Sequence, residues 1–292
     1  MTETMPSMDG SRRDQDFLAP AARLRGGGTA GLAELSDIER SDRLKRMREG
    51  TLGSIHSWEL VTAVDGPGTR MTIFLSGCPL RCQYCHNPDT FNMKDGEPIE
   101  AEELLRRMRR YKNLFRATKG GITLSGGEVL MQPAFARTLL RGAKEMGIHT
   151  ALDTSGFLGA AATDEMLDDV DLVLLDVKSG LPETYKEVTG RELQPTIDFG
   201  DRLAAKGIEI WARFVLVPGL SDAEDNIEAV AEIVKRWGES VTRLEVLPFH
   251  QMGTDKWDAL GLNYTLRDTL PPTPEHTEHV REMFRAHGFT VT

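Results

Sequence analysis

The three cysteines of this chain, Cys78, Cys82 and Cys85, lie within eight consecutive residues, and no other cysteine occurs among its 292 residues. Four kinds of site could use thiols spaced in this way. A disulfide would leave one thiol unpaired and is typical of secreted proteins, while a catalytic thiol needs one cysteine rather than three. Structural zinc could take the three thiolates and His86, but zinc sites usually combine two separate short motifs. The fourth kind is an iron–sulfur cluster.

The Cys-x3-Cys-x2-Cys spacing favours the iron–sulfur cluster. Three thiolates on one tight loop can bind three irons of a 4Fe–4S cluster, and the chain has no fourth cysteine for the last iron. That iron would stay open to a substrate or cofactor. We therefore expect Cys78, Cys82 and Cys85 to ligate such a cluster, and a zinc-stabilised α/β binding protein stays open as the alternative.

Short β-branched runs alternate with longer amphipathic segments along most of the chain. The runs expected to form strands are 71–76, 121–125, 148–153, 171–177, 209–217 and 241–248. Helical patterns lie near 99–111, 133–146, 161–169, 195–206, 222–237 and 274–287. This alternation predicts right-handed crossovers and a parallel sheet buried on both faces. About six βα units are fewer than a closed eight-stranded barrel needs, so an open six-stranded barrel and a doubly wound sheet both fit.

Polar or flexible residues follow almost every expected strand, where parallel α/β proteins place their chemistry. These strand ends read Gly77-Cys78, Ser125-Gly126-Gly127-Glu128, Asp153-Thr154-Ser155-Gly156, Asp176-Val177-Lys178, Pro218-Gly219 and Pro248-Phe249-His250. One such ending would mean little, because glycine and proline are routine turn residues. Several that converge on one rim predict a site for a polar ligand. Arg213 lies inside a strand, where an unpaired charge is costly, so we expect its side chain to point into the cavity.

The cysteine motif CPLRCQYC resembles the CxxxCxφC motif of the radical S-adenosylmethionine (SAM) superfamily, with Tyr84 as the aromatic residue. Other strings resemble, in order and approximate spacing, those of the pyruvate formate-lyase activating enzymes, a family that activates glycyl-radical enzymes. They are DGPGTR at 65–70, CHNPDT at 85–90, SGGE at 125–128, LDTSGF at 152–157, DVK at 176–178, VPG at 217–219 and LPFHQMG at 247–253. The resemblance implies a partial, open six-stranded parallel (βα)6 barrel of the radical SAM type.

The resemblance also implies the reaction. SAM would bind the open iron and be cleaved reductively to methionine and a 5′-deoxyadenosyl radical, which would take a Cα hydrogen from a glycine of a partner enzyme. The implied partner is pyruvate formate-lyase, with a different glycyl-radical enzyme as the alternative, and the implied electron donor is flavodoxin or ferredoxin. Cluster and cofactor perform this chemistry, so no further catalytic side chain is expected.

The SAM-binding residues implied in this way are Tyr84, Cys85, His86, Gly126, Gly127, Glu128, Asp153, Thr154, Asp176, Val177, Lys178, Arg213 and His250. By resemblance, Tyr84 and His86 face the adenine side of the cofactor and His250 lies near the adenosyl group. Gly126 and Gly127 would let the backbone approach the methionine amino group.

The two strand-end carboxylates, Asp153 and Asp176, are expected to bind the ribose or methionine or to hold a monovalent cation, and Lys178 could neutralise the cofactor carboxylate. A structural ion pair at the rim is the other possibility. The residues assigned to a substrate peptide are Asp65, Gly66 and Arg70, in the loop before the first strand, although this loop also fits an ordinary turn.

Residues 1–52 are expected to form a disordered N-terminal extension with a short polar helix at 37–48, ahead of a radical SAM activase domain at 53–292. A formal net charge of −10 argues against nucleic-acid binding, and no apolar run has the length of a membrane span. Because an open iron is easily oxidised, a reducing cytoplasm is expected. We also expect a monomer.

Overall fold

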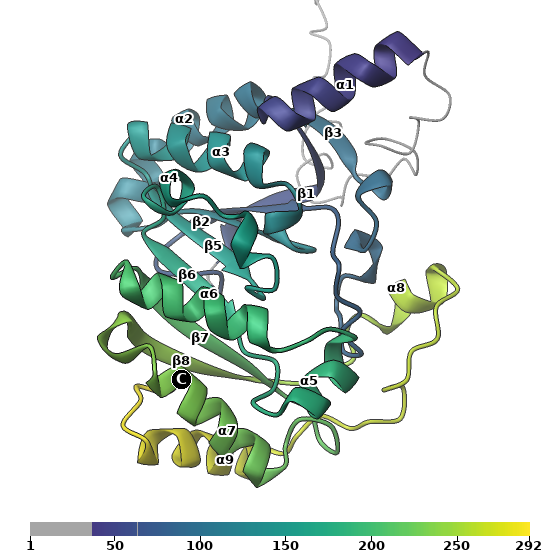
Figure 1. Cartoon of the computed structure of the whole chain (residues 1–292), viewed down its shortest axis with the longest axis vertical. Coiled ribbons are helices and arrows are strands. Elements are labelled where there is room, and N and C mark those ends of the chain that lie inside the picture. The colour runs from purple at the N-terminus through teal and green to yellow at the C-terminus, as the bar shows by residue number, and fades with distance from the viewer. Residues whose placement is uncertain (1–36, 63) are drawn as a thin grey trace, which may run out of the picture.

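The computed structural model describes residues 37–62 and 64–292, so the disorder expected before residue 37 falls outside the described residues. In this described part of the chain, eight strands form one sheet in the order β3-β1-β2-β4-β5-β6-β7-β8 (Figure 1). The six mutually parallel strands are β2 (Arg70–Leu75), β4 (Gly121–Gly126), β5 (His149–Thr154), β6 (Leu172–Asp176), β7 (Glu209–Leu216) and β8 (Val241–Pro248). These are the six strands that the sequence predicts.

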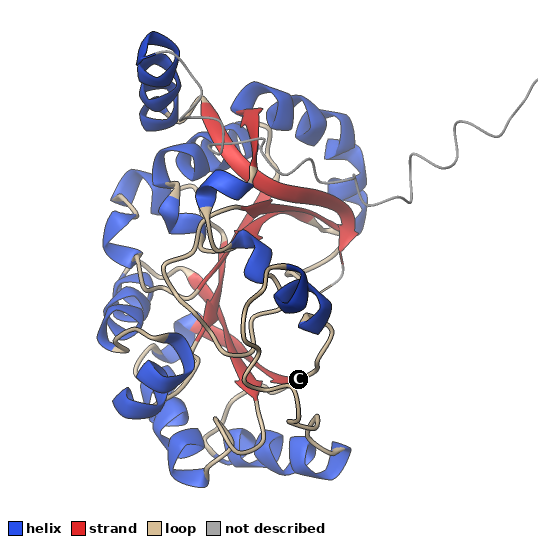
Figure 2. Ribbon diagram, turned by 90° about the vertical axis from the view of Figure 1, so that its right-hand side faces the viewer, coloured by secondary structure: helices blue, strands red, loops and turns tan. Residues whose placement is uncertain are grey.

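The order of these six strands distinguishes between the two architectures. Each parallel strand pairs with the next parallel strand along the chain, whereas a doubly wound sheet reverses its order at a switch point. Figure 2 shows the helices gathered along one side of the curved sheet. Within the described residues the sheet ends at β3 on one side and at β8 on the other. The fold is therefore the expected open, partial barrel.

Two antiparallel strands extend the sheet and are absent from the prediction. β1 (Leu52–Thr62) pairs with β2, and β3 (Glu97–Glu100) pairs with β1. The register of β1 against β2 shifts between Ile55 and Ser57 and again between Leu60 and Thr62, which breaks the alternation that marks a strand. β3 is four residues long and contains Pro98, as edge strands often do.

The helices that follow the predicted patterns are α2 (Ala101–Thr118), α3 (Pro133–Glu145), α4 (Asp164–Leu167), α6 (Gln194–Ala205), α7 (Glu224–Lys235) and α9 (Pro274–Ala286). Two short helices are not predicted, α5 (Pro182–Thr189) and α8 (Thr254–Ala259). Single 3-10 turns are η3 (Pro88–Thr90), η4 (Met93–Asp95), η5 (Val129–Met131), η6 (Gly159–Ala161) and η7 (Gly238–Ser240). Among the described helices, none is long and apolar enough to cross a bilayer.

The alternation of side chains along each strand separates the core from the inner face of the barrel. In β5, Leu152 packs in the main core beneath the helices, while its neighbour Ala151 belongs to a small separate cluster. In β7, Ile210 packs in the main core and Trp211 in the small cluster. Because successive side chains point to opposite faces, the polar residue Asp153 shares the inner face with Ala151. The same periodicity therefore brings strand-end polar groups toward one interior.

The polar helix expected at 37–48 is α1 (Asp37–Glu49), and its described residues 40–49 are mostly exposed. It does not lie free of the domain, however, because its end packs on α3. A Cβ atom added to Gly50 would lie 2.3 Å from the carbonyl oxygen of Ala134. Gly50 has a φ of +76°, which favours glycine where the helix ends.

Candidate active site

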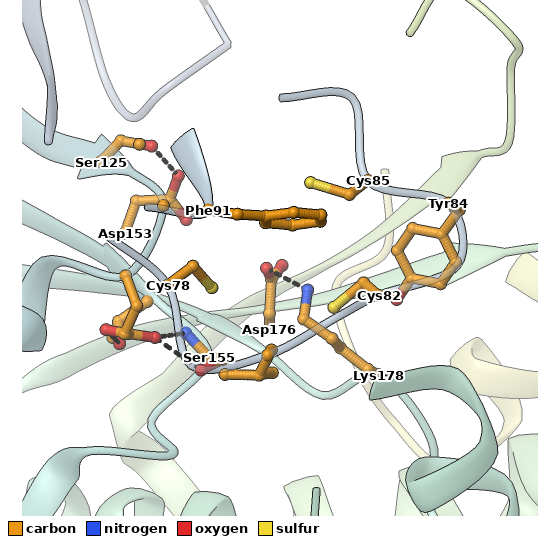
Figure 3. A pocket seen from close by; sticks show the side chains of 15 residues that line it. Cys78, Cys82, Tyr84, Cys85, Phe91, Ser125, Asp153, Ser155, Asp176 and Lys178 are labelled. Atoms are coloured by element: carbon orange, nitrogen blue, oxygen red, sulfur yellow. Dashed lines mark hydrogen bonds and ion pairs between the residues drawn. The ribbon is translucent and has the colours of Figure 1, made fainter. Parts of the chain in front are cut away.

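A cavity of about 120 Å³ lies at the carboxyl ends of β4, β5 and β6 (Figure 3). Its lining residues are Cys78, Leu80, Cys82, Tyr84, Cys85, Phe91, Ser125, Gly126, Gly127, Glu128, Asp153, Thr154, Ser155, Asp176 and Lys178. The structure thus brings the three cysteines together with most of the predicted SAM-binding residues. The predicted residues outside the lining are His86, Val177, Arg213 and His250, together with the three assigned to a substrate peptide.

The cysteines lie on the cysteine loop, residues 76–91, which leaves the end of β2. Backbone hydrogen bonds hold this loop in two places. The amide of Gly77 donates to the carbonyl of Thr90 at 2.7 Å, and that of Arg81 donates to Thr189 at the end of α5 at 2.8 Å. The three thiols are free, and Figure 3 shows their sulfur atoms facing one central space. The loop therefore presents three sulfur ligands to a single cavity.

This donor set fits a 4Fe–4S cluster. Thiolates are the ligands of such clusters, and three of them leave one iron without a protein ligand. Burial raises the pKa of all three thiols, that of Cys85 to about 12, so they are protonated in the metal-free chain. Binding of iron would replace these protons.

The carboxylate of Glu128 joins the ends of β4 and β5. One oxygen accepts hydrogen bonds from Thr154 Oγ1 at 2.5 Å and from the amide of Leu130 at 3.2 Å. The other accepts from Ser155 through its Oγ at 2.6 Å and its amide at 3.0 Å. Glu128 is 2% exposed. Because four donors from the chain already occupy it, the carboxylate holds the cavity wall in place.

Replacing Glu128 by alanine is expected to lower the free energy of unfolding by at least about 2 kcal/mol, because buried donors lose their acceptor. The comparison uses the metal-free, reduced protein and urea unfolding. Glu145→Ala is the matched control, since Glu145 is an exposed residue at the end of α3 and its loss should change stability by less than about 0.5 kcal/mol. Equal losses in the two variants would contradict the bridging role.

Asp153 belongs to a buried row of charged groups on the inner face of the sheet. Its Oδ2 accepts a hydrogen bond from Ser125 Oγ at 2.6 Å, and its Oδ1 lies 3.5 Å from Arg213 Nη1. Arg213 also donates to Glu245 Oε2 at 2.8 Å and to the carbonyl of Val64. Arg213 therefore lies behind Asp153 and is paired within the chain. This differs from the expected direct contact with a ligand.

The pKa of Asp153 is raised to about 6 by burial, although the Arg213 guanidinium opposes the rise. Since the usual value is 3.8, the folded chain holds a proton between about pH 4 and pH 6 that the unfolded chain has released. The contribution of this group to the free energy of unfolding therefore falls as pH rises through that window, and is constant above it.

Asp153→Asn removes this titration. We expect the free energy of unfolding of the unaltered chain, minus that of the variant, to decrease from about pH 4 to about pH 6 and then level off. Urea unfolding of the metal-free proteins across this range measures the difference. A difference that rises with pH, as for a carboxyl whose pKa is lowered in the folded state, would contradict the assignment.

The Lys178 ammonium and the Asp176 carboxylate form an ion pair at the cavity, with Nζ 2.8 Å from Oδ2. Burial alone would lower the pKa of Lys178, but the neighbouring Asp176 carboxylate raises it well above the usual value, so the ammonium stays charged. The same Nζ lies 5.6 Å from the centre of the Tyr84 ring. Within the described residues the buried hydroxyl of Tyr84 has no hydrogen-bond partner. Such a group is costly to bury and is satisfied if a bound ligand supplies a partner.

Three predicted SAM-binding residues lie beside the cavity rather than in its lining. The rings of His86 and His250 stack with their centroids 3.8 Å apart, and His86 Nε2 donates to the carbonyl of His250 at 3.2 Å. Burial lowers the pKa of both rings, that of His86 to about 4, so both are neutral near pH 7. The side chain of Val177 packs in the main core, so only its backbone is available to bind SAM.

The loop assigned to a substrate peptide lies at the amino end of β2, opposite the cysteine loop. Arg70 is 0% exposed and donates to Thr123 Oγ1 at 2.6 Å and to the carbonyl of Pro67 at 3.1 Å. The expectation of a peptide contact therefore does not fit Arg70, whose guanidinium is enclosed by the chain. Gly66 has a φ of +118°, and Asp65 accepts a hydrogen bond from Thr72 Oγ1 at 3.0 Å.

Four lining residues have no role predicted from the sequence, namely Leu80, Phe91, Ser125 and Ser155. Ser125 and Ser155 belong to the strand-end motifs Ser125-Gly126-Gly127-Glu128 and Asp153-Thr154-Ser155-Gly156. Their place at the site could therefore have been predicted from the sequence. Leu80 is the apolar residue between the first two cysteines. Phe91 follows the CHNPDT string, and only the folded loop reveals that its ring lies in the cavity (Figure 3).

Comparisons with known proteins agree with this geometry. The model of the radical SAM superfamily matches residues 72–232. A pyruvate formate-lyase-activating enzyme from Clostridium pasteurianum is 46% identical over 217 residues, which cover 74% of this chain and 90% of that protein. The pyruvate formate-lyase 1-activating enzyme of Escherichia coli strain K12 is 39% identical over 242 residues, covering 82% of this chain and 98% of that protein.

A solved structure shares the fold. A radical SAM methyltransferase from Sphaerobacter thermophilus superposes with a TM-score of 0.55 at 17% identity, covering 89% of this chain and 82% of that one. This likeness concerns the open barrel.

Proposed function

The chain belongs to the radical SAM superfamily and, within it, to the pyruvate formate-lyase activating enzymes, and from this premise we propose that it generates a glycyl radical on pyruvate formate-lyase. Enzymes of this family use a 4Fe–4S cluster and SAM. The observation that carries the proposal is the meeting of three free thiols in one cavity, beside the strand ends that supply its polar wall.

When bound, the cluster supplies the electron that cleaves SAM, and the cleavage leads to removal of one hydrogen atom from a glycine Cα. The chain itself binds, orients and shields. Cys78, Cys82 and Cys85 hold the cluster and leave one iron for SAM. Gly126 and Gly127 let the end of β4 pack closely against Leu75 and Gly77 in the cavity wall, since a Cβ atom at either would lie within 2.4 Å of their backbone atoms.

The charged pair Lys178 and Asp176, at the edge of the cavity, is proposed to bind the amino acid end or the ribose of SAM. The Lys178 ammonium attracts a carboxylate, and Asp176 attracts an amino group or a ribose hydroxyl. The Tyr84 hydroxyl, which is buried without a partner in the described part of the chain, gains a hydrogen bond from the ligand. A monovalent cation between Asp153 and Asp176 stays a prediction.

We further propose that His86 and His250 flank the adenosyl group from beside Cys85. Asp65 is proposed to meet the substrate peptide from the amino end of β2, because its charge lies close enough to the cavity-lining Asp153 to raise the pKa of that carboxyl. Glycine suits hydrogen removal because it has no side chain to obstruct approach. Flavodoxin or ferredoxin is the proposed electron donor, the cytoplasm the proposed location, and a monomer the proposed state. Residues 53–292 would form the activase domain and residues 1–52 an extension.

The proposal is tested by incubating the anaerobically reduced protein with SAM and pyruvate formate-lyase, followed by electron paramagnetic resonance. The expected result is a glycyl signal on pyruvate formate-lyase together with release of 5′-deoxyadenosine. A parallel incubation contains a different glycyl-radical enzyme as the matched control.

Each outcome decides between stated alternatives. A signal that appears only on the other enzyme would show that the partner is wrong while the reaction class holds. A colourless protein that contains zinc and releases no 5′-deoxyadenosine would favour the zinc-stabilised binding protein and overturn the proposal.

A further inference from the structure

A segment that sequence analysis did not connect with the cysteines lies directly against them. We call residues 250–270 the C-terminal strap; it follows β8 and contains α8. Figure 1 shows α8 away from the sheet, beside the part of the chain that carries the cysteines, and α8 contacts η3 in the cysteine loop. Gln251 closes the strap on itself, donating from Nε2 to the carbonyls of Leu266, Arg267 and Thr269 at 3.2, 2.6 and 2.9 Å.

The contact between the strap and the cysteine loop centres on Trp257. Its indole N–H donates to the carbonyl oxygen of Cys85 at 2.9 Å, and the residue is 7% exposed. Its ring meets Phe91 edge-on, with centroids 5.9 Å apart, and lies 5.3 Å from the ring of Tyr264. Phe91 in turn lines the cavity, whereas Trp257 does not. Trp257 therefore acts on the cavity through residues that it contacts, above all Cys85 and Phe91.

Two further contacts fix the strap against the same stretch of loop. A Cβ atom at Gly253 would lie 2.9 Å from the Cα of His86, so the two backbones touch. Lys256 Nζ donates to Asn87 Oδ1 at 2.6 Å and lies 3.4 Å from Asp89 Oδ1. The strap thus holds the loop by packing, by backbone contact and by charge, over five consecutive residues that begin at Cys85.

We propose that the C-terminal strap clamps the cysteine loop and that Trp257 is a positioning residue for Cys85; this rests on the proposed cluster. The indole fixes the Cys85 carbonyl, so the peptide that carries this thiol keeps its direction into the cavity. The aromatic contacts with Phe91 and Tyr264 keep water and oxidants from the outer side of the loop. Without the indole N–H the loop opens more often and Cys85 is exposed more often.

The test compares Trp257→Phe with Trp237→Phe. The control also loses a buried indole hydrogen bond, because Trp237 is 2% exposed and donates to Asp201 Oδ1 at 3.2 Å, away from the cavity. In the metal-free reduced proteins, alkylation of Cys85 by iodoacetamide is followed by site-resolved mass spectrometry. In the iron-loaded proteins, anaerobic release of iron to a chelator is followed by absorbance.

We expect Trp257→Phe to speed Cys85 alkylation and iron release about two- to tenfold, the factor that one lost hydrogen bond supplies. Trp237→Phe should stay within about twofold of the unaltered chain. Failure of Trp257→Phe alone to load iron would also support the clamp. Equal Cys85 alkylation in the two variants would overturn it. An unaltered chain that binds no iron would instead overturn the proposed function, and the alkylation comparison would still decide the clamp.

Discussion

Replacing Cys82 by serine is expected to abolish the iron–sulfur cluster and the activase reaction. Cys82 is 8% exposed, and the chain has no fourth cysteine to take its place. A serine hydroxyl is a hard, weakly acidic donor that replaces thiolate poorly on iron. The loss of glycyl-radical formation should exceed the roughly 10- to 100-fold typical of groups that merely surround metal ligands. Iron content and the glycyl signal measure the two effects.

The matched control is Gln83→Ala, in the same loop. Gln83 does not line the cavity; its Nε2 donates to the carbonyl of Glu187 at 2.9 Å, outside it. This variant should keep its iron, which separates loss of a ligand from general disturbance of the loop. If Cys82→Ser kept both iron and activity, the assignment of the three thiols would be wrong.

The second large effect is expected from Gly126→Ala, at the end of β4. Gly126 has a φ of +118°, and a Cβ atom there would lie 2.3 Å from the backbone nitrogen and oxygen of Leu75. Neither backbone conformation nor space therefore admits a side chain. We expect a loss of at least about 3 kcal/mol in the free energy of unfolding, together with loss of SAM binding.

Gly147→Ala separates the cost of the backbone conformation from the cost of the steric clash. Gly147 has a φ of +66° but nothing within 4 Å of an added Cβ, so only the conformational cost of about 1–2 kcal/mol applies. Urea unfolding and equilibrium binding of SAM to the iron-loaded proteins give the comparison. Similar losses of stability in both variants, with SAM binding intact in Gly126→Ala, would contradict a close-packed cavity wall at this strand end.

Local patterns in the sequence were enough to predict the six parallel strands and much of the lining of the cavity. The carboxyl ends of parallel strands meet at one edge, so the residues after β4, β5 and β6 could be predicted to gather without knowledge of the fold. The alternation within β5 likewise sets Asp153 and Leu152 on opposite faces. The cysteine spacing alone indicated the type of site.

Contacts between residues that are far apart in the sequence could not be predicted from local patterns. Arg213 lies beside Glu245 only because β7 and β8 pair in that register, and it reaches Asp153 across β6. Arg70 follows a segment rich in glycine and proline that suggested a peptide-binding loop or an ordinary turn, yet it begins β2 and donates hydrogen bonds to Thr123 and to the carbonyl of Pro67. Trp257 is 172 residues from Cys85 along the chain, in a six-residue helix with too few turns for a periodic signal.

The most direct test of the account is the state of iron in a protein purified without air. Chemical analysis should find about four irons and four sulfides per chain, and Mössbauer spectroscopy should resolve one iron whose signal changes when SAM is added. Three protein thiolates then hold the cluster and the remaining iron receives the cofactor. A preparation without iron, or one in which SAM changes no iron signal, would contradict a cluster that is held by three thiolates and binds SAM at its remaining iron.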